Sequence, residues 1–214
     1  MKLYDYPASC NCYKVRLLLS NLGLDYERVP VDIFGGDTLT DQFALINPAR
    51  ATPVLETDDG RFLPESGAIL LYLAHGTPLL PSEPFELAQV VRWLQYEQAD
   101  LVPAIGGLRF RLLAGRLSET DPDAVRRREE ADQVLRLLDD QLFARGFLVG
   151  ERYTVADIAV YGYTHRACEA GIDFDPYPNV RAWLTRVEDQ PGYMEDVAPY
   201  GPNAAPGAGA SIYG

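Results

Sequence analysis

The stretch KLYDYPASCNCYKVRLLLSNLG, residues 2–23, decides the fold, because a short strand in it turns directly into a helix. Polar and apolar side chains alternate over Lys2–Tyr6, as they do in a half-buried strand. Pro7-Ala8-Ser9 interrupts this pattern, and Asn21-Leu22-Gly23 ends the helix. Between them, apolar side chains recur at helical spacing, at Cys12, Val15, Leu18, Leu19 and Leu22. The sequence therefore predicts a strand–helix unit with Ser9 at the start of the helix.

The residues that follow, up to residue 76, continue the alternation of strands and helices. The patterns predict a strand over Tyr26–Asp32, a short helix over Leu39–Leu45, a hairpin over Val54–Thr57 and Arg61–Leu63, and a helix over Ser66–Ala74. The order is β-α-β-α-β-β-α. We expect a small α/β domain over residues 1–76, with strands of both senses in one sheet.

The second part of the chain carries helical signals alone. Residues 77–84 are rich in proline and have no periodic pattern, so we expect a linker there. Helices are predicted over Phe85–Ala99, with a continuation to about Arg116 after a break at Pro103–Gly107, and over Asp123–Phe143, Thr154–Ala170 and Asn179–Gln190. Thr154 and Asp157 form a start that resembles a capping box. We expect an all-α domain over residues 85–198 and a loose tail over residues 199–214, which are rich in Gly, Ala and Pro.

Composition and charge restrict the partners. The chain has 214 residues, 47% of them hydrophobic, and a formal net charge of −12. This charge disfavours nucleic acid and anionic membranes as partners. Apolar runs fall short of the roughly 18 residues of a membrane span, and the three cysteines form no disulfide framework, so we expect a cytoplasmic protein. His75 and His165 lie far apart without matched ligands, so we expect no metal site.

The predicted helix start at Ser9 and Cys10 is the strongest candidate for chemistry. Unpaired backbone N–H groups and the helix dipole stabilise an anion there. The Ser9 hydroxyl can donate to the thiolate of a ligand, or Ser9 can be a plain N-cap serine. Cys10 can be a reactive thiolate or a small buried hydrophobe. Cys10 and Cys12 point in nearly opposite directions on a helix, which disfavours a disulfide between them.

Two further pairs of residues suggest the ligand. Thr52-Pro53 precedes a predicted strand, and a proline there permits a cis peptide bond, a turn that would leave the main chain of Thr52 open to an extended ligand. Glu65-Ser66 begins a helix and offers a carboxylate for an ammonium group and N–H groups for a carboxylate, although a plain helix cap explains it too. A thiol at Ser9, main-chain pairing at Thr52 and an amino-acid head at Glu65-Ser66 outline glutathione.

At this point the chain resembles the cytosolic glutathione transferases over roughly residues 1–195. The resemblance rests on four stretches: SCNCYKVR at residues 9–16, NPARATPVL at 47–55, ESGAILLYL at 65–73 and TVADIA at 154–159. It implies a thioredoxin-like N-terminal domain, an all-helical C-terminal domain, a homodimer and a role in detoxification. The helix start is similar to bacterial members and to the serine-using theta and zeta classes.

The resemblance also implies roles for individual residues. Ser9 lies five residues before Lys14-Val15, the register of the activating serine, and Asn11 would be a second donor. Thr52, Glu65 and Ser66 would hold glutathione, with Pro53 as the cis-proline. Arg50 stands where relatives usually carry glycine, and it either binds a carboxylate of glutathione or is simply solvated. Thr52 likewise departs from the usual valine.

The electrophile would bind in the helical domain. Gly106-Gly107 stand where relatives carry larger side chains, which suggests an open pocket. The candidate lining residues, for which ordinary core packing is the alternative, are Tyr96, Ile105, Arg109 and Phe110. The resemblance therefore implies a glutathione transferase that ionises the thiol of glutathione for attack on an electrophile. Two alternatives stay open: a thiol–disulfide reductase or deglutathionylase that uses Cys10, and a non-catalytic binding module.

Overall fold

A computed structural model describes residues 1–212 and has the predicted order of elements in its first part. The elements are β1 (Lys2–Asp5), α1 (Cys10–Asn21), β2 (Glu27–Pro30), α2 (Asp41–Ile46), β3 (Val54–Glu56), β4 (Phe62–Pro64) and α3 (Ser66–Ala74), with a 3-10 turn over Asp37–Leu39 between β2 and α2. The sheet has the order β2-β1-β3-β4. β1 pairs with β2 in parallel and with β3 antiparallel, and β3 and β4 form the predicted hairpin.

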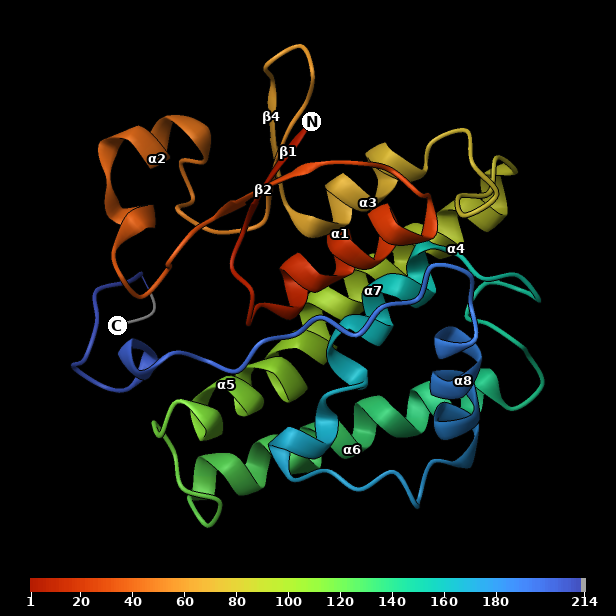
Figure 1. Ribbon diagram of the computed structural model, residues 1–214. Helices are drawn as coiled ribbons and strands as arrows, with labels where there is room; N and C mark the ends of the chain where they lie inside the picture. The colour runs from red at the N-terminus through yellow and green to blue at the C-terminus, as the bar shows by residue number, and fades with distance from the viewer. Residues whose placement is uncertain (213–214) are drawn as a thin grey trace.

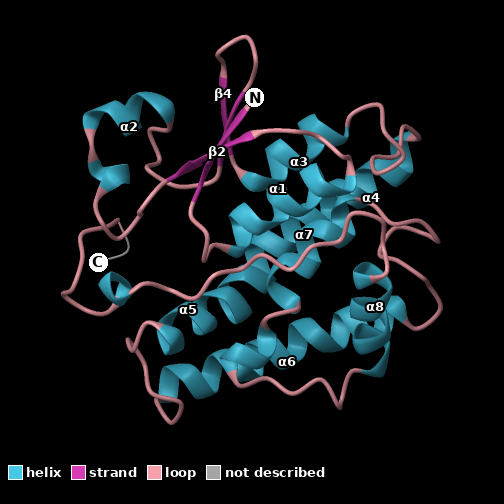
Figure 2. Cartoon of the chain, in the orientation of Figure 1, coloured by secondary structure: helices cyan, strands magenta, loops and turns pink. Residues whose placement is uncertain are grey.

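The second part of the chain is helical, as predicted. It contains α4 (Pro84–Tyr96), a π-helix over Glu97–Gly106, α5 (Gly107–Leu113), α6 (Pro122–Leu142), α7 (Val155–Thr164) and α8 (Pro178–Glu188), with 3-10 turns over Ala167–Ala170 and Pro202–Ala204. Figure 2 shows the strands gathered at one end of the molecule, with α2 to their left and α1 and α3 to their right. The architecture is thus a thioredoxin-like α/β domain joined to an all-helical domain.

The core joins the two parts. α1 packs against α3 and α7 in the centre of the molecule (Figure 1). Buried side chains from both parts, among them Leu18, Trp93 and Trp183, belong to one hydrophobic cluster. The capping box predicted at α7 is confirmed, because Asp157 accepts from the Thr154 N–H at 2.9 Å while the Thr154 hydroxyl accepts from the Ala156 N–H. α1 is therefore held from both sides, which fixes the position of its first residues.

The predicted break at Pro103–Gly107 was wrong. The chain runs through it as a π-helix that continues into α5. A wider turn accommodates Pro103, whose ring would clash in an α-helix. A Cβ built on Gly106 would lie 2.5 Å from the ring of Tyr163, so this glycine lets the π-helix approach α7 closely.

The expectation of a loose tail also differs from the structure. The tail leaves α8 and crosses the molecule toward α2, as the blue trace in Figure 1 shows. The Ala210 N–H donates to the Phe34 carbonyl at 2.8 Å, and Asn203 donates to Asp32 at 2.9 Å. Tyr200 packs on aromatic rings of both domains, a long-range contact that composition does not reveal. The last two tail residues, 213–214, lie outside the described part.

Residues 1–212 contain neither a membrane-spanning helix nor a cluster of metal-ligating side chains. No helix there has the length and apolarity needed to cross a bilayer. No group of three or more His, Cys, Asp or Glu side chains in the same residues is arranged to hold a metal ion.

Candidate functional site

Ser9 caps α1. Its backbone is extended (φ −79°, ψ 121°), and its hydroxyl accepts a hydrogen bond from the Cys12 N–H at 3.3 Å. Because the hydroxyl accepts this bond, its proton remains available to another acceptor. Ser9 is half-buried and lines a cavity of about 320 Å³. The Ser9 hydroxyl, a weak hydrogen-bond donor, and the N-terminus of α1 therefore both lie at this cavity.

The cavity lies between the two domains. Both domains and the tail contribute to its lining, which combines a few polar groups and one arginine with aromatic, aliphatic and glycine residues. The lining residues are Tyr6, Ser9, Asn11, Ile33, Phe34, Thr52, Val102, Pro103, Gly106, Gly107, Phe110, Arg111, Tyr163 and Tyr200. A cavity with a few convergent polar groups and mostly apolar walls is typical of a small-molecule site.

Asn11 is oriented by a buried network of charges. Its Oδ1 accepts from Lys14 Nζ at 2.7 Å and from the Ser66 hydroxyl at 3.4 Å. Lys14 is fully buried and forms an ion pair with Glu97 of the π-helix, which is 1% exposed. Its Nζ also lies 5.0 Å from the ring centre of Tyr163. With Oδ1 occupied, the amide Nδ2 of Asn11 is the donor left for a ligand in the cavity.

The sequence patterns did not predict the buried Lys14–Glu97 ion pair beside the cavity. Lys14 was noted only for its register after Ser9, and Glu97 lies within a predicted helix without any motif. The sequence offered one signal: Lys14 lies within the apolar pattern that runs from Cys12 to Leu22, and a charge that becomes buried needs a partner. The partner comes from a residue 83 positions away, which a local pattern does not reveal.

Of the residues predicted to hold glutathione, Thr52 lines the cavity and Ser66 bonds to Asn11, which also lines it, whereas Pro53 and Glu65 are not among the lining residues. The Thr52-Pro53 peptide bond is cis, as the sequence suggested. Thr52 lines the cavity beside Ser9 and Asn11, and among residues 1–212 its main-chain N–H and C=O have no hydrogen-bond partner. Ser66 is buried at the start of α3 and bonded to Asn11. Glu65 precedes it, exposed and with φ at 72°, a left-handed backbone that is uncommon outside glycine.

Arg50, predicted either to bind a carboxylate of glutathione or to be solvated, forms hydrogen bonds to main-chain carbonyls. Its guanidinium donates to the carbonyls of Thr38 and Thr40, both at 3.0 Å. These two bonds hold the residues just before α2 in place. Its φ of 56° explains why glycine is the easier residue at this position. Arg50 does not belong to the cavity lining described above.

Both cysteines at the helix start are buried. Cys10 is 1% exposed, and burial raises the pKa of its thiol. Cys12 is fully buried, and burial raises its pKa to about 12. The two side chains belong to different hydrophobic clusters, in keeping with the opposite directions predicted for them, and both thiols are free. Burial disfavours the thiolate, so Cys10 lacks the surroundings of a reactive cysteine.

Of the four residues predicted to line the electrophile pocket, Phe110 lines the cavity and three do not. Tyr96 packs edge-on against Trp93, Ile105 is fully buried in the core, and Arg109 is 2% exposed and paired with Glu169. The glycine pair Gly106-Gly107 did not reveal which face of the π-helix turns to the cavity. The aromatic residues that sequence reasoning missed are Tyr6, Phe34, Tyr163 and Tyr200.

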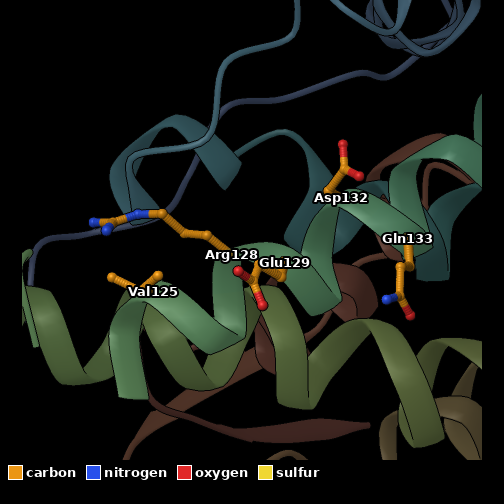
Figure 3. A pocket seen from close by; sticks show the side chains of 5 residues that line it. All are labelled: Val125, Arg128, Glu129, Asp132 and Gln133. Atoms are coloured by element: carbon orange, nitrogen blue, oxygen red, sulfur yellow. The ribbon is translucent and has the colours of Figure 1, made fainter. Parts of the chain in front are cut away.

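A second hollow, of about 500 Å³, lies along α6 and is lined by Val125, Arg128, Glu129, Asp132 and Gln133. Figure 3 shows these side chains pointing in different directions rather than toward one point. Arg128 and Asp132 already bond other protein groups. This surface lacks convergent groups, so the cavity at Ser9 is the candidate site.

Comparisons with known proteins agree with this architecture. Residues 3–81 match the family model of the glutathione S-transferase N-terminal domain, and residues 99–191 match that of the C-terminal domain. The chain is 33% identical to disulfide-bond oxidoreductase YfcG of Escherichia coli, covering 88% of this chain and 90% of that protein. It is 32% identical to glutathione S-transferase 3 of Zea mays, covering 92% and 93%. It is 34% identical to elongation factor 1-gamma of Artemia salina, covering 88% of this chain but spanning only 44% of that protein's length.

Solved structures agree as well. A glutathione S-transferase from Pseudomonas fluorescens has a TM-score of 0.88 and 43% identity, covering 91% of this chain and 97% of that one. A glutathione transferase from Burkholderia graminis, solved with two glutathione molecules per subunit, has a TM-score of 0.79 and 31% identity, covering 89% and 84%. The chain therefore belongs to the glutathione S-transferase family.

Proposed function

We propose that the protein is a glutathione transferase in which Ser9 and Asn11 stabilise the thiolate of glutathione. One observation carries the proposal: the Ser9 hydroxyl at the N-terminus of α1 and the amide of Asn11 line the same cavity. Lowering the pKa of a thiol by about 2 requires roughly 2.7 kcal/mol. One charge-assisted hydrogen bond and a helix N-terminus supply about that much.

The peptide part of glutathione would lie across the N-terminal domain. The free main chain of Thr52 would pair with the extended cysteinyl unit, and Pro53 would hold that turn in place. Glu65 would bind the ammonium group of the γ-glutamyl end, while Ser66 and the N–H groups at the start of α3 would bind its carboxylate.

The reaction then follows from the cavity. The thiol proton leaves to solvent, and the thiolate stays beside Ser9. Its sulfur forms a bond to an electrophilic carbon held by the helical domain, and the leaving group departs with the bonding electrons. The physiological role would be detoxification of electrophiles in the cytoplasm.

The Ser9→Ala variant tests this assignment. We expect the pKa of enzyme-bound glutathione, followed by the ultraviolet absorbance of the thiolate, to rise by about 1 or more, with a loss in kcat of about tenfold or more. Cys10→Ala is the matched control at the neighbouring position and should retain activity. If Ser9→Ala keeps both the wild-type pKa and full conjugating activity, Ser9 has no such role.

The likeness to the E. coli oxidoreductase favours a second candidate, thiol–disulfide exchange. The thiolate of glutathione would attack one sulfur of a disulfide, form a mixed disulfide and release the other sulfur as a thiolate. If Cys10 were the nucleophile instead, incubation with oxidised glutathione would add a glutathionyl group to Cys10 that mass spectrometry detects. Burial of Cys10 supports the version in which glutathione itself attacks.

A non-catalytic role remains the third candidate. Calorimetry that detects glutathione binding, combined with no turnover of halides, epoxides, peroxides or disulfides, would establish a binding module and exclude the first two. The intact set of Ser9, Asn11 and Thr52 in one cavity argues for turnover.

We also propose a homodimer. Large apolar side chains are exposed on β4, α3 and α4: Phe62 (40%), Tyr72 (49%) and Phe85 (69%). Exposed apolar residues of this kind suit a partner surface. Light scattering after size-exclusion chromatography measures the mass, and a monomer at micromolar concentration contradicts the proposal.

A further inference from the structure

One wall of the cavity carries an arginine that has no carboxylate partner within residues 1–212. Arg111 of α5 lines the cavity, and within residues 1–212 its guanidinium forms no ion pair. Its Nη1 donates to the Gly107 carbonyl at 2.9 Å. Because Gly107 also lines the cavity, this hydrogen bond holds the positive charge at the cavity edge.

A second guanidinium lies close to the same glycine. A Cβ built on Gly107 would lie 3.2 Å from Arg111 Nη1 and 3.6 Å from Arg127 Nη1. Arg127 of α6 donates to the Pro103 carbonyl at 3.0 Å and pairs with Asp123 at 2.9 Å. Asp123 also pairs with Arg126, which has Glu130 as a second partner, so Arg126 and Arg127 are together balanced by two carboxylates. Within residues 1–212, Arg111 therefore brings one positive charge without a carboxylate partner beside Gly107.

The surrounding walls are aromatic and carry no opposing charge. The rings of Phe34 and Phe110 stack at 5.6 Å with 14° between their planes, and Tyr200 packs edge-on against both. Among the lining residues that the structure describes, Arg111 is the one side chain ionised at neutral pH, although the whole chain has a net charge of −12. The positive charge of Arg111 among apolar walls is therefore opposite in sign to the net charge of the chain, and it would attract an anion to this part of the cavity.

Tyr163 adds a neutral donor to this wall. Burial raises the pKa of its phenol well above the usual value, so the hydroxyl stays protonated. The hydroxyl forms no hydrogen bond within the described residues, and Tyr163 lines the cavity. A protonated phenol can donate to an acceptor on a bound molecule.

We infer that this half of the cavity binds an electrophile whose flat aromatic ring carries an anionic substituent, with the ring against Phe110 and Tyr200 and the anion at Arg111. The inference deepens the proposed function and rests on it for the reaction, because glutathione would occupy the other half at Ser9 and Thr52. A neutral analogue would leave the guanidinium without an anion, and a site built for a polar group discriminates strongly against a ligand that lacks it.

A matched pair of substrates tests the inference. 4-Chloro-3-nitrobenzoate and 4-chloro-3-nitrobenzamide have nearly the same shape and differ in charge. In both, the thiolate sulfur bonds to the ring carbon that bears chlorine, and chloride leaves with the bonding electrons. With rates corrected for the uncatalysed reaction, we expect KM for the benzamide to exceed KM for the benzoate about tenfold, the worth of one charge-assisted hydrogen bond.

Variants locate the effect. In Arg111→Gln the ratio of KM for the benzamide to KM for the benzoate should fall to about one. In Arg111→Lys, which keeps a positive charge, this ratio should stay above one but below ten. Arg145→Gln, which removes an exposed arginine after α6, is the control for net charge and should keep the ratio at about ten. The KM for glutathione shows whether Arg111 binds a carboxylate of glutathione instead: a tenfold rise in Arg111→Gln would overturn the inference.

Binding without turnover separates this inference from the proposed function. 3-Nitrobenzoate and 3-nitrobenzamide lack the leaving group, so calorimetry measures their affinity whether or not the protein catalyses conjugation. Binding of the benzoate about tenfold tighter than the amide, lost in Arg111→Gln, supports the anion site even if no substrate is turned over. Equal affinity for the two ligands, or a preference that survives in Arg111→Gln, overturns it.

Discussion

Replacing Lys14 by Met should destabilise the protein strongly, because it leaves Glu97 buried without its ion-pair partner. Both side chains are at most 2% exposed, and the pair joins α1 to the π-helix of the other domain. Removing one partner of such a pair costs about 3–5 kcal/mol. In Lys14→Met, the Glu97 carboxylate would keep only the hydrogen bond from Gln98 Nε2, which is 2.9 Å long.

The double variant Lys14→Met, Glu97→Met should recover most of this loss, because no charge then remains buried. We expect it to be destabilised by about 1–2 kcal/mol, mainly from the lost bond to Asn11. Urea unfolding at one protein concentration, followed by the fluorescence of the buried Trp93 and Trp183, gives the free energy of unfolding for each member of the cycle. A double variant that loses as much as the two single variants together would refute the idea that the ions are coupled.

Three further predictions concern packing, acid stability and thiol access. Gly106→Ala should lower the thermal unfolding midpoint, with a cost of about 1–3 kcal/mol, because its Cβ would meet the Tyr163 ring at 2.5 Å. Gly107→Ala would meet only the end of the Arg111 side chain, at 3.2 Å, and should cost clearly less; equal midpoints would contradict this. Burial lowers the pKa of His165 to about 4, so between pH 6.5 and 4 the unfolded chain binds a proton that the folded protein does not. Over this range the free energy of unfolding of the wild type should fall relative to His165→Phe by about 1.4 kcal/mol per pH unit, measured by urea unfolding, and a constant difference would contradict the assignment. In the native protein an alkylating agent should label the exposed Cys168 before the buried Cys10 and Cys12, as mass spectrometry of peptides can check, and early labelling of Cys10 would revive it as a nucleophile.

Local patterns were enough for the elements that depend on neighbouring residues. The helix start at Ser9, the β3–β4 hairpin, the cis peptide before Pro53 and the cap at Thr154 each follow from side chains within a few positions. Turn, cap and strand preferences act over that range, so the sequence alone predicts them.

Local sequence patterns did not predict which residues of the helical domain line the cavity. The glycine pair Gly106-Gly107 suggested Ile105 and Arg109 as lining residues, whereas the π-helix turns Val102, Pro103 and Gly106 toward the cavity. A π-helix shifts the register of the faces, and its hydrogen bonds leave no clear mark in the order of apolar residues.

The sequence by itself determined the two-part architecture and the placement of a serine hydroxyl at a helix N-terminus, because periodicity and capping are properties of short segments. Only the tertiary structure decided which groups share the site. It pairs Lys14 with Glu97, bonds Ser66 to Asn11, and brings Tyr200 from the tail against Phe34 and Phe110. Contacts between residues so far apart depend on how the two domains pack, which no local pattern encodes.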